Sequence, residues 1–104
     1  MAWVFLAIAG LLEIVWAVAM KQSDGFTRLM PTAVMLVAMI GSFALLAMAM
    51  RALPLGTAYM IWTGIGAIGA FAVGVAFMGD ALTPMRLAAA TMIVAGLAVM
   101  KLAA

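Results

Sequence analysis

The chain has 104 residues, of which 71% are hydrophobic, and only eight carry charge at pH 7: five Lys or Arg and three Asp or Glu. A soluble globular domain is typically about 45–50% apolar and about 25% charged, so this composition excludes one. Because cysteine and histidine are absent, disulfide frameworks, the usual zinc sites and histidine-based catalysis are excluded, and we expect no metal and no cofactor. Five scattered cations form no basic patch, so nucleic acid is not an expected partner.

Long apolar stretches predict four transmembrane helices, at about residues 3–20, 31–50, 55–79 and 84–102. A transmembrane helix needs about 17–25 largely apolar residues. The last uncharged run is short, but Pro84 suits a first helical position, and Arg86 and Lys101 can extend toward the interfaces. Short connections make consecutive helices antiparallel. The expected fold is therefore an all-α integral membrane bundle in the lipid bilayer, with one domain over residues 1–104.

Two other interpretations of the apolar stretches are weaker. Ala17-Val18-Ala19 has the form of a signal-peptide cleavage site. However, no Lys or Arg precedes it, and Glu13 interrupts the apolar run, which departs from the signal pattern. A transmembrane β-barrel would require alternating apolar and polar residues over about ten positions, and no such alternation occurs here.

The cations are almost evenly divided between the two sides of the predicted bundle. One side holds Arg51 and Lys101, and the other holds Lys21, Arg28 and Arg86. The positive-inside rule therefore gives almost no preference for an orientation. Either a single weak orientation or insertion in both directions is compatible with this balance, and the second would let opposite copies pair as an antiparallel dimer.

Small residues provide surfaces on which transmembrane helices can associate. The third helix carries Gly66, Ala70 and Gly74 at four-residue spacing, and the fourth carries Ala88, Ala89, Ala95 and Gly96. We expect Ala89 and Gly96 to pack in a dimer. Packing within one subunit is the alternative for at least one of these faces, and the spacing does not decide between them.

Glu13 is the only acidic residue within a predicted span. A carboxylate at that depth costs on the order of 2.5–3.5 kcal/mol or more, so it is a candidate functional residue facing a cavity or a partner. A low-dielectric setting disfavours its charged form, and a second copy of Glu13 nearby would do so further. Such a group holds either a proton or a cation, which is the basis of proton/cation exchange. The alternative is a protonated, hydrogen-bonded structural residue.

Helical spacing brings aromatic and small residues near Glu13. Trp16 lies one turn away, and Gly10 and Ala17 keep the approach to the carboxylate open. Tyr59 and Trp62 line one face of the third helix, and Ser42 is one of few hydroxyls at membrane depth. A carboxylate framed by aromatic rings suits a cation with a flat or apolar surface. The alternative is that the aromatic residues lie at the membrane interfaces.

The whole chain resembles a small multidrug resistance transporter, specifically the guanidinium exporter subtype. The resemblance rests on a lone glutamate within Gly10-Leu11-Leu12-Glu13-Ile14-Val15-Trp16-Ala17, on Gly25-Phe26-Thr27-Arg28, and on the run from Pro54 through Tyr59 and Trp62 to Ala67. The combination of Glu13, Trp16 and Lys101 marks the subtype.

The resemblance implies a role for each matching residue. Glu13 would bind protons and guanidinium alternately, Trp16 and Ser42 would hydrogen-bond the carboxylate, Tyr59 and Trp62 would line the pocket, and Gly10 would lie beside the carboxylate. It also implies an antiparallel dual-topology homodimer in a bacterial inner membrane that works by alternating access. Met60 departs from the small residue usual at its position, which could change the hydrophobic substituents tolerated.

Three functions follow from these residues. The first is a proton-coupled antiporter that exports guanidinium-type cations. The second is an exporter of quaternary ammonium or other hydrophobic cations; the extra indole of Trp16, and the expectation that no aromatic side chain lies near Ser42 on the second helix, argue against it. The third is a membrane assembly factor in which Glu13 is structural. Enzyme activity is not expected, because one intramembrane carboxylate and isolated hydroxyls make no nucleophile and base pair.

Overall fold

The computed structural model describes residues 1–104 and contains four α-helices: α1 (Ala2–Gln22), α2 (Leu29–Ala49), α3 (Leu55–Phe77) and α4 (Pro84–Ala103). Each is long and apolar enough to cross a membrane. The prediction of an all-α chain with four candidate membrane spans is confirmed. The observed bounds differ from the predicted ranges by at most two residues at any end.

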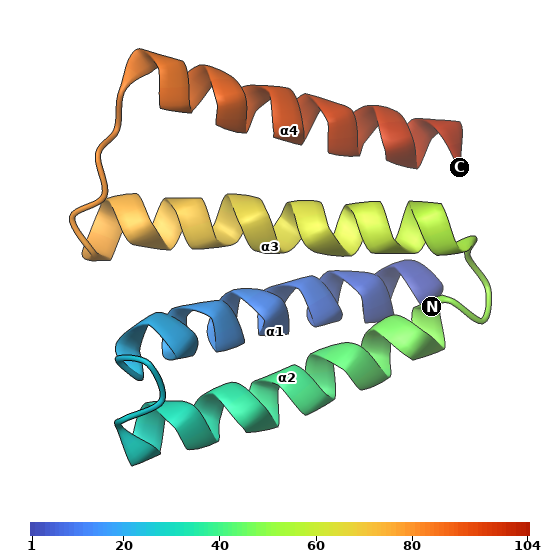
Figure 1. Cartoon of the computed structure of the whole chain (residues 1–104). Helices are drawn as coiled ribbons and strands as arrows, with labels where there is room; N and C mark the ends of the chain where they lie inside the picture. Colours follow the sequence, from blue (N-terminus) through green and yellow to red (C-terminus); the bar gives the residue numbers. More distant parts are fainter.

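The four helices lie side by side in the order α4, α3, α1, α2 (Figure 1). The chain measures 40 × 35 × 16 Å along its principal axes. A helix with its side chains is about 10–12 Å across, so the chain forms a layer little more than one helix deep. A layer this thin does not by itself enclose a site in its middle.

The short loops place the chain ends and the charges at the two edges of the layer. The N-terminus, the α2–α3 loop and the C-terminus lie at one end, and the α1–α2 and α3–α4 loops lie at the other (Figure 1). Arg51 and Lys101 are therefore at one end, opposite Lys21, Arg28 and Arg86.

Local sequence determines where the helices begin and end. Thr83 caps α4, because its hydroxyl accepts a hydrogen bond from the Arg86 backbone N–H at 3.1 Å, and Pro84 takes the first helical position. Gly79 follows α3 with a φ of +74°, a left-handed conformation that glycine adopts without steric cost. The α1–α2 loop is held by buried Ser23, whose hydroxyl donates to the Met20 carbonyl at 2.7 Å.

Small residues let α1 and α3 approach closely. The three residues Gly66, Ala70 and Gly74 follow the side of α3 near α1 and the α3–α4 loop: a side chain at Gly66 would meet Glu13, and one at Gly74 would meet Asp80. This face therefore packs within the subunit. The buried core where α1, α2 and α3 meet consists of Leu6, Ala9, Leu46, Ala49, Ala58, Ile61 and Trp62.

Helix α4 lies at the edge of that core and touches it through the partly buried Leu97 and Met100. No residue of α4 is buried, and its backbone lies near α3 alone. Most of its apolar surface is thus left uncovered within one copy of the chain.

Candidate functional site

Glu13 lies near the middle of α1 and faces α3. Its carboxylate rests directly against Gly66, where an added Cβ would collide with Glu13 Oε1 and Cδ. Only glycine at position 66 leaves room for it. Glu13 Oε1 is buried and has no hydrogen-bond partner. An unpaired buried acceptor is costly, and a proton or a cationic donor at this oxygen would remove that cost.

Gly10 lies one turn before Glu13 and packs against α3. A Cβ on Gly10 would approach Ile65 Cγ2 to 2.6 Å and Ile65 Cβ to 2.8 Å. The expectation that Gly10 keeps the approach to the carboxylate open is therefore wrong, because the Ile65 side chain fills that space. Gly10 instead brings α1 and α3 close together, which sets the Glu13 carboxylate against Gly66.

Ser42 connects three helices through its hydroxyl. Ser42 Oγ on α2 donates to the Ala9 carbonyl on α1 at 2.6 Å and accepts from the Trp62 Nε1–H on α3 at 3.0 Å. Ser42 is fully buried, and Trp62 is 6% exposed. These hydrogen bonds fix the Trp62 indole between α1 and α2 and satisfy its buried donor.

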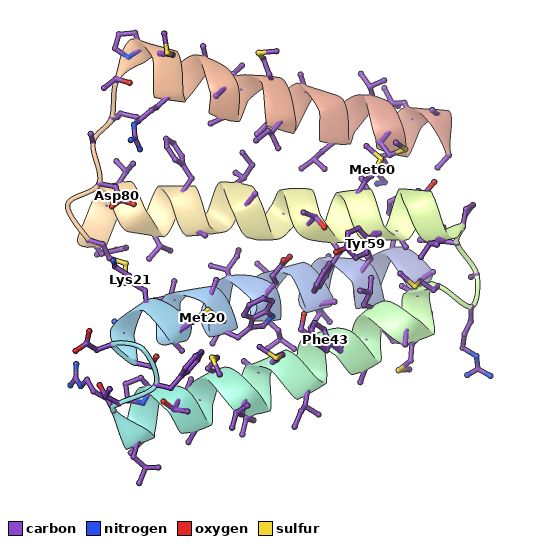
Figure 2. The ribbon with its side chains drawn as sticks, in the orientation of Figure 1. Met20, Lys21, Phe43, Tyr59, Met60 and Asp80 are labelled. Carbon is purple, nitrogen blue, oxygen red and sulfur yellow. The ribbon has the colours of Figure 1, made fainter.

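Four aromatic rings form a continuous chain beside the carboxylate, which we call the aromatic chain. Trp16 contacts Phe43 edge to face at 6.3 Å between ring centroids. Phe43 also lies 5.8 Å from Trp62, which lies 5.4 Å from Tyr59. Phe43 and Tyr59 are about half exposed, at 48% and 52%. The aromatic chain therefore offers two accessible rings (Figure 2).

The hydrogen bonds implied for Trp16 and Ser42 are absent from this conformation. The Ser42 hydroxyl binds Ala9 and Trp62 rather than the carboxylate. Trp16 Nε1 is buried without a partner, as is Glu13 Oε1. The two residues are three positions apart on one helix face, so an unpaired donor and an unpaired acceptor lie on the same side of α1.

Phe43 joins the candidate site through its ring contacts, and the sequence interpretation missed it. The expectation that no aromatic side chain lies near Ser42 on the second helix is wrong, because Phe43 joins Trp16 to Trp62. Its position directly after Ser42 in the sequence was an available signal. The presence of the Phe43 ring beside Ser42 therefore weakens the case against hydrophobic cations as substrates.

The other predicted residues lie away from the carboxylate. Met60 points from α3 toward α4 (Figure 2) and lines an apolar groove of about 460 Å³ with Gly96 and Met100. Ala89 borders the neighbouring groove, beside Arg86. Nothing lies within 4 Å of a Cβ added to Gly96.

Lys101 also lies outside the site, at the end of α4. Its Nζ stands over the Trp3 ring at 5.4 Å from the centroid. This cation–π contact joins the ends of α4 and α1 across the face of α3.

Comparison with known proteins gives close matches over nearly the whole chain. The family model described as "Small Multidrug Resistance protein" matches residues 1–93. A protein of Escherichia coli (strain K12) named "Guanidinium exporter" is 54% identical over 102 residues, covering 98% of this chain and 97% of its own. Proteins with the same name from Citrobacter freundii and Salmonella typhimurium are 52% identical with the same coverage.

Proposed function

The chain belongs to the small multidrug resistance family, and we propose that it exports guanidinium and small substituted guanidinium ions in exchange for protons. It is a multi-pass membrane transporter and not an enzyme. The relatives named for guanidinium export support this substrate class. Their bacterial sources support a place in the bacterial inner membrane.

The observation that carries the proposal is the buried, unpaired Oε1 of Glu13 against Gly66. An ionised carboxylate in that setting needs a counter-charge, and a neutral one needs a proton. No Lys or Arg lies in the central part of any helix. Glu13 therefore binds either a proton or a cation from outside the chain, and the two compete for the same oxygens.

Guanidinium matches this site in charge and shape. It is planar and always charged, and its N–H groups form paired hydrogen bonds with carboxylate oxygens. The half-exposed ring of Tyr59 suits a flat cation through cation–π contact, and the buried Trp62 packs against that ring. Trp16 Nε1, which has no partner, donates to the Glu13 carboxylate when the cation is bound. Ser42 keeps Trp62 in place.

We propose that the working unit is an antiparallel homodimer with dual topology. One copy is only 16 Å thick and leaves α4 without a buried residue. A second copy covers that surface, with Ala89 and Gly96 in the contact, and brings a second Glu13 to the site. The near balance of cations at the two ends permits insertion in both directions.

Alternating access follows from this arrangement. With the paired Glu13 residues deprotonated, the site takes guanidinium from the cytoplasm. Protons that arrive from outside displace the cation, and the protonated site returns to the cytoplasmic side, where it releases the protons. The inward proton gradient thus drives export.

A second candidate is export of quaternary ammonium ions, which Phe43 favours. Its half-exposed ring adds an apolar, π-rich surface next to Trp62. The experiment that separates the two is uptake into liposomes with an imposed proton gradient, comparing guanidinium, methylguanidinium and tetraethylammonium. Transport of guanidinium and methylguanidinium alone supports the proposal, and equal transport of tetraethylammonium supports the second candidate.

A further inference from the structure

A second carboxylate contacts the same face of α3 that holds Glu13. Asp80, in the α3–α4 loop, lies over Gly74 so closely that a Cβ on Gly74 would collide with Asp80 Oδ2. The Asp80 backbone N–H also donates to the Gly74 carbonyl at 3.0 Å. Glycine at position 74 thus holds Asp80 against the end of α3, just as Gly66 accommodates Glu13.

The two carboxylates therefore mark two points on one seam between α1 and α3. Gly66 and Gly74 are eight residues apart, which is about 12 Å along a helix. Ala70 lies between them on the same side of α3. Glu13 is at the membrane-buried end of this seam, and Asp80 is at its outer end.

A cavity of about 250 Å³ occupies the outer part of the seam. Lys21 and Asp80 are the charged residues that line it, and both lie at the end of the layer with the α3–α4 loop (Figure 2). A water molecule takes about 30 Å³ in the liquid, so the cavity has room for several, with polar partners at its mouth. The lining residues are Ala17, Val18, Lys21, Ala70, Gly74, Met78 and Asp80.

The inner end of the cavity lies about one helical turn from the Glu13 carboxylate. Ala17 follows Glu13 by four residues on α1, and Ala70 follows Gly66 by four residues on α3. Each offset is one turn, or about 6 Å. Glu13 is not among the lining residues, so in this conformation the cavity does not reach the carboxylate. A small separation of α1 and α3 at that turn would extend the cavity to Glu13 Oε1, which has no partner.

We propose that the α1–α3 seam connects Glu13 to water at one membrane surface, with Asp80 as the carboxylate that exchanges protons there; in the antiparallel homodimer the seams of the two copies open on opposite sides. The inference rests on the proposed function and adds a proton path separate from the aromatic chain. Lys21 places a positive charge at the same mouth as Asp80, and the small side chains of Ala17 and Ala70 leave space for water.

The test measures proton release when guanidinium is added to purified protein in detergent with a pH-sensitive dye. Asp80→Asn removes the carboxylate and keeps its shape, and Ala70→Val narrows the cavity and keeps both charges. We expect each to slow proton release at least fivefold, to increase its solvent deuterium isotope effect, and to leave the equilibrium affinity for guanidinium within twofold. Asp80→Glu is expected to restore the rate.

Asp24→Asn is the matched control. Asp24 is exposed in the α1–α2 loop at the same end of the chain, and asparagine tolerates its φ of 51°. The Asp24→Asn variant is expected to release protons at the rate of the unmodified protein. If either Asp80→Asn or Ala70→Val assembles and releases protons at the rate of the unmodified protein, the proposed proton route is wrong. Ala70→Val tests the route even where Asp80→Asn does not assemble. Absence of proton release from the unmodified protein contradicts the proposed exchange itself.

Discussion

The carboxylate of Glu13 on α1 lies directly against the α-carbon of Gly66 on α3, with no side chain between them. This contact explains how a carboxylate fits at membrane depth between two closely packed helices. It also makes position 66 sensitive to any added atom.

Gly66→Ala therefore displaces the Glu13 carboxylate. Overpacking costs about 1–3 kcal/mol, and we expect a loss of guanidinium affinity of about 5- to 160-fold if that energy falls on the binding-competent position of Glu13. Calorimetric titration with guanidinium measures it. Gly56→Ala on the same helix is the control, because nothing lies within 4 Å of its added Cβ. Equal affinities for the two variants would show that the Gly66 contact does not position Glu13.

Ser42→Ala removes the acceptor for the buried Trp62 indole N–H. An unsatisfied buried donor costs about 1–3 kcal/mol, so we expect the free energy of unfolding in mixed micelles to fall by about that amount. Thr32→Ala on the same helix removes an exposed hydroxyl and should change stability by less than about 0.5 kcal/mol. Combining Ser42→Ala with Trp62→Phe should cost less than the sum of the single changes, and strict additivity would argue against the hydrogen bond.

Phe43→Leu breaks the aromatic chain at its centre, between Trp16 and Trp62. Each aromatic pair contributes about 0.5–1.5 kcal/mol, and Phe43 makes two. We therefore expect guanidinium affinity to fall by about 5- to 160-fold if all of that energy positions the rings for the cation. Phe43→Tyr keeps the ring and should retain most of the affinity. Quenching of tryptophan fluorescence by the bound cation provides the titration. Unchanged binding by Phe43→Leu would place Phe43 outside the site.

Gly96→Leu tests the α4 surface as a dimer contact. Nothing lies within 4 Å of a Cβ at Gly96, so the added side chain begins in open space within one copy. We expect it to weaken dimerisation at least tenfold, about 1.4 kcal/mol, as measured by energy transfer between labelled copies in liposomes. Gly56→Ala again serves as the control. A dimerisation affinity that Gly96→Leu leaves unchanged would show that the dimer contact lies on another face.

Much of the fold could be predicted from the sequence, for physical reasons that particular residues illustrate. Long apolar runs without alternating polar residues predict helices in lipid, because a helix satisfies its backbone hydrogen bonds within the segment. Pro84 and Gly79 mark helix ends, because proline has a fixed φ and glycine permits a positive one. The lone Glu13 stands out because a buried charge is costly. These signals are local in sequence.

The partners of the site residues could not be predicted in the same way. Spacing placed Gly10 and Trp16 on the face of Glu13, but only the crossing of α1 and α3 shows that Ile65 fills the space at Gly10. Likewise, the Ser42 hydroxyl could have bound several groups, and the approach of α2 to α1 selects the Ala9 carbonyl. From the sequence alone, the side of α3 with Gly66 and Gly74 was equally suited to dimerisation. The position of α1 in the structure shows that this side packs within the subunit.

Substitution of Glu13 by Gln tests the central claim most directly. The amide keeps the size of the side chain but cannot alternate between a charged and a neutral form. In liposomes with an imposed proton gradient, we predict that Glu13→Gln loses gradient-driven guanidinium uptake, while Asp24→Asn, which removes an exposed acidic charge, retains it. Gradient-driven uptake by Glu13→Gln at the rate of the unmodified protein would contradict the account.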